Sequence, residues 1–215
     1  MDKIYKSVIN ALIFASDEPI KGNELIKVIK SIDGEDIAIS VSDIEKTVDE
    51  LNAGFEETEQ PFRIKKIAEG FTFATNQEYA NYIGYLSTET SKRRLSQSAV
   101  ETLSIVAYKQ PITKPEIETI RGVNSDYIIN TLLEKNLITI KGRADTMGRP
   151  LLYGTTEEFL KYFGLNRITD LPKPREIEEI MKDEEFLEQK RQIMLNQMEE
   201  VAENEGGTGE EDSED

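Results

Sequence analysis

The sequence predicts a mainly α-helical protein with small β hairpins (α+β class), built as two similar tandem units and an acidic tail. Three observations lead to this prediction. Segment 16–25 resembles segment 108–117, and both carry a Pro-Ile pair just before a helix start. Apolar residues at helical spacing surround both copies, and two strand-like runs close each unit. The formal net charge is −16, of which residues 166–215, with 6 basic and 17 acidic side chains, carry −11.

One helix precedes the Pro-Ile pair in each unit. Its apolar residues recur every three or four positions, as on one face of an α-helix. The proline ends this helix because the residue before a proline avoids the helical conformation. A second helix follows over residues 22–30 and 114–120. The stripes of the first helices are Ile4, Val8, Leu12 and Ala15 in one unit, and Ala99, Leu103, Val106 and Ala107 in the other.

The third helix of each unit has its own start signal. In the first unit, Ser42-Asp43-Ile44-Glu45 has the spacing of a capping box. In the second, Gly122 suits a helix end, and Asn124 or Ser125 suits the next N-cap. The apolar stripes are Ile44, Val48 and Leu51 in the first unit, and Ile128, Ile129, Leu132 and Leu133 in the second.

Two strand-like runs follow each third helix. Alternating apolar and polar residues predict strands at 62–67 and 70–75, with Glu69-Gly70 at the turn. The second pair is expected at 138–140 and 151–153, and short aromatic helices over 79–86 and 159–163 close the units. Three helices followed by a hairpin is the order of a winged helix.

We therefore predict two tandem winged-helix domains and a tail that is partly helical and partly disordered. The tail has one narrow apolar edge and then loses all large apolar side chains. One mixed domain with a chance repeat is the alternative. The expected boundaries are 1–87 for the first domain, 88–94 for the linker, 95–165 for the second domain, 166–203 for a tail with an amphipathic helix at 176–203, and 204–215 for a disordered acidic end.

The composition excludes several kinds of active site. The chain has no Cys and no His, so it cannot build the usual zinc sites, a Ser-His-Asp triad or a thiol redox centre. We expect no catalytic, cofactor-binding or metal-binding residue, although an enzyme that uses carboxylates and a metal is a further hypothesis. Neither an 18-residue apolar run nor a secretion signal occurs, which predicts a cytoplasmic protein that is not membrane-bound.

Several motifs of the second unit resemble one family. Leu-Ser-Gln-Ser-Ala-Val-Glu-Thr-Leu-Ser-Ile-Val-Ala-Tyr-Lys-Gln-Pro-Ile-Thr, which begins at Leu95, is similar to the start of the C-terminal winged helix of segregation and condensation protein B, a bacterial condensin subunit. The resemblance covers nearly all of 95–172, is weaker in the first unit and does not extend to the tail. Its other motifs are segments 120–126, 142–143, 148–156, 159–165 and 170–172.

The resemblance implies a non-catalytic scaffold in chromosome condensation and segregation. Such proteins form homodimers through the first unit and bind the kleisin subunit ScpA, which the second unit would hold here. They modulate the SMC ATPase through the kleisin, are cytoplasmic and nucleoid-associated, and contact DNA indirectly or weakly. The alternative is a dimeric winged-helix transcription regulator. Against it, the third helix of the second unit has one cation, Lys135, beside Asp126 and Glu134.

Candidate contact residues are aromatic, cationic or apolar, because such side chains dominate protein interfaces. Packing within the protein and ordinary surface ion pairs are the simpler roles for many of them. For dimerisation the candidates are Ile4, Val8 and Leu12. For partner binding they are Tyr108, Arg121, Tyr127, Arg143, Arg149 and Tyr153.

Overall fold

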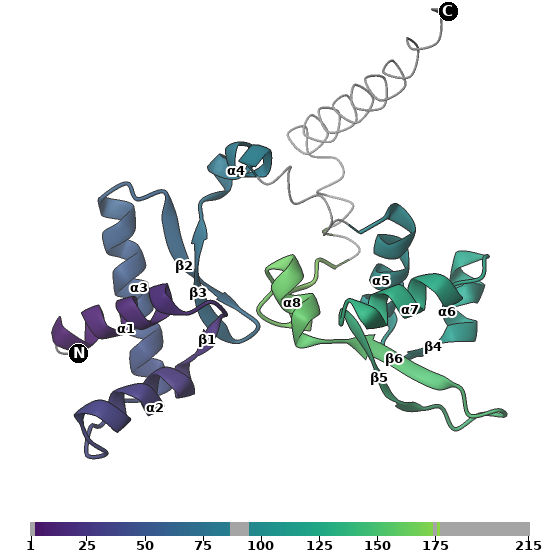
Figure 1. Ribbon diagram of the computed structural model, residues 1–215, viewed down its shortest axis with the longest axis horizontal. Coiled ribbons are helices and arrows are strands. Elements are labelled where there is room, and N and C mark those ends of the chain that lie inside the picture. Colours follow the sequence, from purple (N-terminus) through teal and green to yellow (C-terminus); the bar gives the residue numbers. More distant parts are fainter. Residues whose placement is uncertain (1–2, 87–94, 174–175, 177–215) are drawn as a thin grey trace, which may run out of the picture. The chain divides into compact units, whose positions relative to one another are not determined.

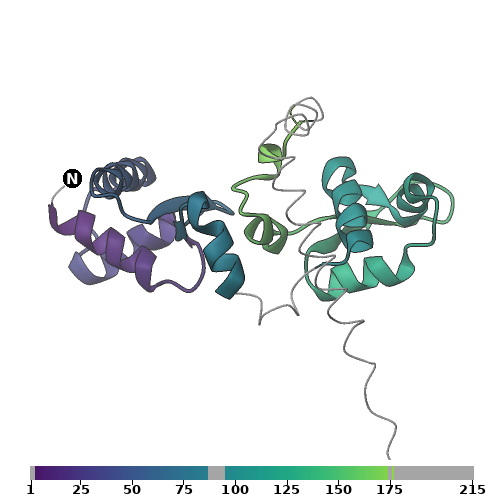
Figure 2. The ribbon, with the colours of Figure 1, turned by 90° about the horizontal axis from the view of Figure 1, so that it is seen from above.

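The computed structural model describes residues 3–86, 95–173 and 176. The described residues up to Asp170 form one compact unit. The compact unit contains two three-stranded sheets, each accompanied by its own helices (Figures 1 and 2). We call residues 3–86 the first assembly and residues 95–163 the second assembly.

The first assembly has three helices followed by a hairpin. Its sheet has the order β1-β3-β2, with both pairings antiparallel. A 3-10 turn (Gln77–Tyr79) and a short helix follow the hairpin. The elements are α1 (Lys3–Ala15), β1 (Ile20–Lys21), α2 (Gly22–Asp33), α3 (Val41–Glu57), β2 (Phe62–Ile67), β3 (Gly70–Thr75) and α4 (Ala80–Leu86).

The second assembly repeats this order. Its sheet is β4-β6-β5, again antiparallel throughout. The predicted fold class, mainly helical with small antiparallel sheets (α+β), is thereby confirmed. The elements are α5 (Gln97–Lys109), β4 (Ile112–Thr113), α6 (Lys114–Arg121), α7 (Asp126–Glu134), β5 (Ile138–Arg143), β6 (Leu151–Thr155) and α8 (Glu157–Phe163), followed by the 3-10 helix η3 (Ile168–Asp170).

The repeated Pro-Ile pair has a structural reason that the sequence did not reveal. In each copy the isoleucine begins a strand of only two residues: Ile20 pairs with Phe71, and Ile112 pairs with Tyr153. Each short strand joins the hairpin to the helical part of its assembly. These strands, β1 and β4, were not predicted because two residues show no alternation.

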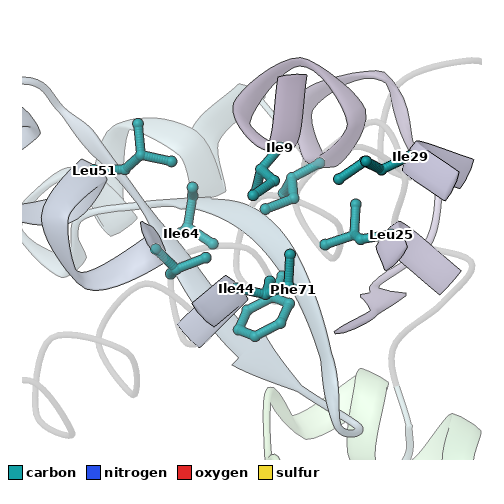
Figure 3. Packing of buried hydrophobic residues seen from close by; sticks show 9 residues of the cluster. Ile9, Leu25, Ile29, Ile44, Leu51, Ile64 and Phe71 are labelled. Carbon is teal, nitrogen blue, oxygen red and sulfur yellow. The ribbon is translucent and has the colours of Figure 1, made fainter. Parts of the chain in front are cut away.

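The core of the first assembly lies between its helices and its sheet. Side chains from α1, α2, α3, β2 and β3 point toward one another (Figure 3). On α1 the buried residues are Ile9 and Ile13, whereas Val8 and Leu12 are half-buried against the core and Ile4 is 66% exposed. The predicted stripe therefore lies one position away from the face that is most deeply buried.

The starts of α2 and α6 agree with the sequence, whereas α4 begins one residue later and α8 two residues earlier than predicted, and the start of α3 also differs. The N-cap of α3 is Ser40, two positions before the predicted Ser42, and its capping partner is Asp43. The Asp43 carboxylate accepts hydrogen bonds from the Ser40 hydroxyl (2.6 Å) and N–H (3.0 Å). These bonds lower the pKa of Asp43. Gly122 ends α6 in the left-handed conformation (φ 72°) and Ser125 is the N-cap of α7, as predicted.

The turn of the first hairpin also lies one residue earlier than predicted. Ala68 (φ 50°) and Glu69 (φ 64°) form it, both with positive φ. Gly70 instead begins β3, where a Cβ atom would stand 2.5 Å from the carbonyl oxygen of Pro19. The glycine is thus required by the close approach of β1.

Residues after α8 contact this turn. The Ala68 N–H donates to the carbonyl of Leu165 (2.9 Å), and the Glu69 N–H donates to Asn166 Oδ1 (2.9 Å). Arg167 Nε lies 3.2 Å from Glu69 Oε1. The linker at 88–94, the remainder of the tail helix from residue 177 and the end at 204–215 lie outside the described residues, so the predicted domain boundaries stay predictions.

Candidate partner-binding surfaces

The second assembly exposes an apolar surface around the start of α7. Tyr127 is 79% exposed there, whereas Ile129 on the opposite face is buried. Ile120 and Val123, from the turn between α6 and α7, are 53% and 54% exposed. We call Ile120, Val123 and Tyr127 the α6–α7 surface.

Arg121 supports this surface from beneath. Its side chain is only 9% exposed, and its guanidinium lies 3.5 Å from Glu101 Oε2 and 3.4 Å from the Ser125 hydroxyl. Lys114, at the other end of α6, forms an ion pair with Asp126. That contact raises the pKa of Lys114 and lowers the pKa of Asp126. Arg121 was predicted to bind a partner, but in the folded chain it holds α5, α6 and α7 together.

The exposed faces of both third helices are acidic or neutral. On α7 they consist of Asp126, Tyr127, Asn130 and Glu134, with no cation. On α3, Lys46 is the single exposed cation, and it is outnumbered by exposed acidic residues. A helix that reads a DNA groove normally offers Arg, Lys, Asn or Gln to bases and phosphates, so neither face suits that role.

The cations that the sequence singled out gather on the hairpin of the second assembly. Arg143 and Arg149 are exposed, and Arg143 Nη1 donates to the carbonyl of Arg149 (3.0 Å). Neither forms an ion pair within the described residues, and nor does the neighbouring Lys141. Met147, at the tip, is fully exposed. The structure thus brings Arg143 and Arg149 together, away from the α6–α7 surface.

The two remaining tyrosine candidates differ in burial. Tyr108, near the end of α5, is 44% exposed. Tyr153 is 7% exposed because β6 is the central strand and its partner Ile112 lies beside it. A side chain this deep in the core cannot be an anchor for another protein, so Tyr153 is removed from the partner-binding candidates.

The first assembly exposes an aromatic cluster that the sequence analysis did not identify. Phe14, at the end of α1, is 78% exposed and stands edge-to-face with Phe73 of β3, with ring centroids 5.8 Å apart. Phe55 and Phe62 contact Phe73 from the other sides. We call these four residues the Phe14 cluster. The sequence signal that could have revealed this cluster is Phe14, a large aromatic residue that lies outside the apolar stripe of the first helix.

Side chains suited to chemistry do not gather in the described part of the chain. There, no group of three or more His, Cys, Asp or Glu residues could hold a metal ion. In the same residues, no helix is both long and apolar enough to cross a membrane. The candidate contact surfaces are the α6–α7 surface, the Phe14 cluster and the cationic hairpin.

Comparison with known proteins assigns the chain to a family. The sequence profile of the family described as "Segregation and condensation complex subunit ScpB" matches residues 7–174, which include both assemblies. The chain belongs to the ScpB family. The resemblance seen in the second unit is confirmed, and it extends over the first unit as well.

Individual relatives agree with this assignment. Segregation and condensation protein B of Symbiobacterium thermophilum is 43% identical over 173 residues, which cover 80% of this chain and 74% of that protein. The Clostridium tetani protein of the same name is 38% identical over 84% of this chain and 91% of its own length. A solved dimer of an ScpB N-terminal domain complexed with an ScpA peptide is 23% identical, covers 40% of this chain and 90% of that one, and has a TM-score of 0.32.

Proposed function

We propose that this ScpB-family chain is a non-catalytic scaffold subunit of a bacterial SMC–kleisin complex. It acts in the cytoplasm, at the nucleoid, as a homodimer that binds the kleisin ScpA and through it modulates the SMC ATPase. One observation carries the proposal beyond the family name: the third helix of the second assembly presents Tyr127 among apolar neighbours and without cations. Such a face suits a protein partner better than a phosphate backbone.

The α6–α7 surface is the proposed kleisin contact. Exposed aromatic residues act as anchors in protein interfaces because they bury much area with little loss of side-chain freedom. Arg121 holds the helices beneath Tyr127, so that this anchor is presented on a rigid base. Tyr108, Arg143 and Arg149 stay candidate contacts outside this surface.

The Phe14 cluster is the proposed dimer contact. It unites the end of the first helix with the hairpin, and the exposed ring of Phe14 would leave water on association, together with the exposed parts of the other three rings. Ile4, also exposed on α1, extends the apolar area of the same helix. Val8 and Leu12 pack against the core, so they would support such an interface from behind rather than form it.

Binding to purified ScpA tests the kleisin contact. We expect the full chain to co-elute with ScpA in size-exclusion chromatography with light scattering. Tyr127→Ser should weaken the measured Kd by about tenfold or more, as for an interface anchor. Tyr82→Ser is the matched control, since Tyr82 of α4 is 76% exposed and lies outside the proposed surface. Equal affinity of the two variants would remove the α6–α7 surface from the proposal, and absence of any complex would reject the kleisin role.

The same light-scattering measurement, on the chain alone, tests the dimer. Phe14→Asp places a charge in the proposed interface and should yield monomers at concentrations where the wild type is dimeric. Ile32→Asp changes an equally exposed residue of α2, which is 76% exposed, and should leave the dimer intact. A dimer that survives Phe14→Asp would show that another face mediates association.

A further inference from the structure

Among the residues that the structure describes, no strand pairs with the outer edge of β5, the outer strand of the second hairpin. The Thr155 N–H of β6 donates to Gln110 Oε1 (2.8 Å), which lies on the β4 side of that strand. Its partner on the other side, Ile138 of β5, is therefore in a pair without mutual hydrogen bonds. The N–H and C=O groups of Ile138 consequently point away from the sheet. Because this direction alternates along a strand, those of Ile140 do so too.

The corresponding edge of the first assembly is closed by a side chain. Asn52 of α3 donates through Nδ2 to the carbonyl of Ile64 (2.9 Å) and accepts the Ile64 N–H at Oδ1 (2.8 Å). Ile64 of β2 is the equivalent of Ile138. Ile20 of β1 pairs with Phe71, and Ile64 lies opposite Phe73, two residues further along β3. In the same way Ile112 of β4 pairs with Tyr153, and Ile138 lies opposite Thr155, two residues further along β6. The amide of Asn52 thus takes the place that another strand would occupy.

The second assembly has no such closure. Its buried N-cap Ser125 and buried helix residues Ile129 and Leu132 match Ile44, Val48 and Leu51 of α3. In this alignment the counterpart of Asn52 is Leu133, which has no group that could bond to a strand. No side chain of the described residues bonds to the backbone of β5 on this edge.

The accessible stretch of the edge runs from Ile140 to Arg143. Ile138 is 1% exposed, whereas Ile140 is 48% exposed and the next three residues are also exposed. Lys141 and Arg143 belong to this stretch, Arg149 stands opposite, and none of the three forms an ion pair within the described residues. An exposed apolar side chain is thus flanked by uncompensated positive charge on a chain whose net charge is −16.

We infer that the edge of β5 from Ile140 to Arg143 binds an extended peptide segment of a partner protein, with acidic side chains around an apolar one. The segment would add a strand to the sheet order β4-β6-β5, with backbone hydrogen bonds giving affinity and charge giving selectivity. A lysine such as Lys141 and a bulge such as that between Ile140 and Gly142 commonly prevent an edge strand from pairing with a second copy of the same chain. They do not repel a strand of opposite charge. This inference needs no kleisin and is independent of the proposed function.

Defined peptides test strand addition on the full chain. The probe is a fluorescent eight-residue peptide of alternating Val and Glu, followed by anisotropy at low salt. We expect it to bind, whereas the same peptide with Lys for Glu should not. A third peptide keeps the glutamates and has proline at the two central valines, which removes backbone donors without changing charge. It should bind about tenfold more weakly or worse.

Charge reversal in the protein distinguishes this edge from others. The double variant Lys141→Glu, Arg143→Glu should lose about tenfold in affinity for the Val-Glu peptide and gain affinity for the Val-Lys peptide. The matched control, Lys46→Glu with Lys65→Glu, changes two exposed cations of the first assembly and should leave both affinities unchanged. Amide chemical shifts of Ile140 and Gly142 on titration locate the bound peptide without any substitution.

Three outcomes would overturn the inference. Equal binding of the proline peptide would show attraction of charge without strand pairing. Binding of a 20-base-pair DNA duplex, but of no peptide, would show that the hairpin contacts phosphates. A Val-Glu peptide that does not bind, or that shifts no amide of β5, would show that this edge is closed to partners. Failure of the kleisin experiment would affect none of these results.

Discussion

The two assemblies share one order of elements but differ most in their hairpins. The first hairpin closes with the two-residue turn of Ala68 and Glu69, and Asn52 closes its outer edge. The second continues through a longer loop over 144–150, and within the described residues its cations form no ion pair and Leu133 stands where the first has Asn52. The shared order reflects the common requirement to bury one apolar cluster per assembly. The differing hairpins indicate that the outer edge of the first hairpin is bonded within its own assembly, whereas the outer edge of the second can accept a strand of a partner.

The largest expected effect comes from a crowded glycine of the first hairpin. Gly70→Ala should destabilise the chain by about 3 kcal/mol, because its Cβ would collide with the backbone of Pro19 and part β1 from β3. Gly54→Ala, in the last turn of α3 where an added Cβ would meet nothing within 4 Å, should instead stabilise by about 0.5 to 1 kcal/mol. Urea denaturation of both variants measures the difference. Similar midpoints would mean that β1 is not fixed against the hairpin.

The next largest effect on stability is expected from exchanging Asn52 and Leu133, the residues that distinguish the outer edges of the two hairpins. Asn52→Leu should cost about 2 to 3 kcal/mol, because both backbone groups of buried Ile64 lose their partners. Leu133→Asn should change stability by no more than about 1 kcal/mol, because lost apolar burial and a new hydrogen bond offset each other. Thermal unfolding followed by circular dichroism suffices. If Leu133→Asn proves as damaging as Asn52→Leu, the alignment of the two assemblies is wrong.

A smaller effect separates the residues that precede the two Pro-Ile pairs. Gln110 bonds to the Ala107 carbonyl and to the Thr155 hydroxyl and N–H, so Gln110→Ala should cost about 1 to 2 kcal/mol. Glu18, its counterpart, forms an exposed ion pair with Lys161, and Glu18→Ala should cost less than about 0.5 kcal/mol. Chemical denaturation at low and high salt compares them. A salt-sensitive Gln110 variant would contradict the hydrogen-bond account.

The smallest effect concerns acid stability at the helix starts. The Thr113 hydroxyl (2.6 Å) and N–H (2.8 Å) donate to the Glu116 carboxylate and lower its pKa, as Ser40 does for Asp43 in the first assembly. A pKa lowered by folding means that the stabilisation is complete above the ordinary pKa and is lost as the pH falls through the lowered value. Glu116→Gln should therefore reduce the difference in urea midpoint between pH 7 and pH 3. An unchanged difference would show that this carboxylate contributes nothing.

Most of the fold could be predicted because it depends on patterns longer than one helical turn. The strands of the first hairpin were predicted with the bounds that the structure has, since apolar and polar residues alternate there. β5 was expected to end at Ile140, because Gly142 and the cations beyond it show no apolar alternation. The cap of α3 was placed on Ser42, because two serines precede the same helix and only the backbone distinguishes Ser40 from Ser42.

The candidate surfaces were harder to predict because burial depends on contacts between distant elements. Tyr127 and the hairpin arginines, named as candidate contacts, are exposed, whereas Tyr153 is buried beside Ile112, which belongs to a strand too short to predict. Arg121 was taken for a contact residue because its partner Glu101 lies 20 residues away. The unpaired edge of β5 was not predicted, because it depends on Leu133 standing where the first assembly has the amide of Asn52. This difference is seen only when the two assemblies are compared.

The two-residue strands have a mechanical consequence. β1 ends at Lys21 and α2 begins at Gly22, and β4 ends at Thr113 where α6 begins at Lys114. In neither place does a linker residue separate the strand from the helix, so a movement of the hairpin would move the following helix with it. A displacement of either hairpin would therefore shift the start of the helix that follows its two-residue strand, which is α2 in the first assembly and α6 in the second.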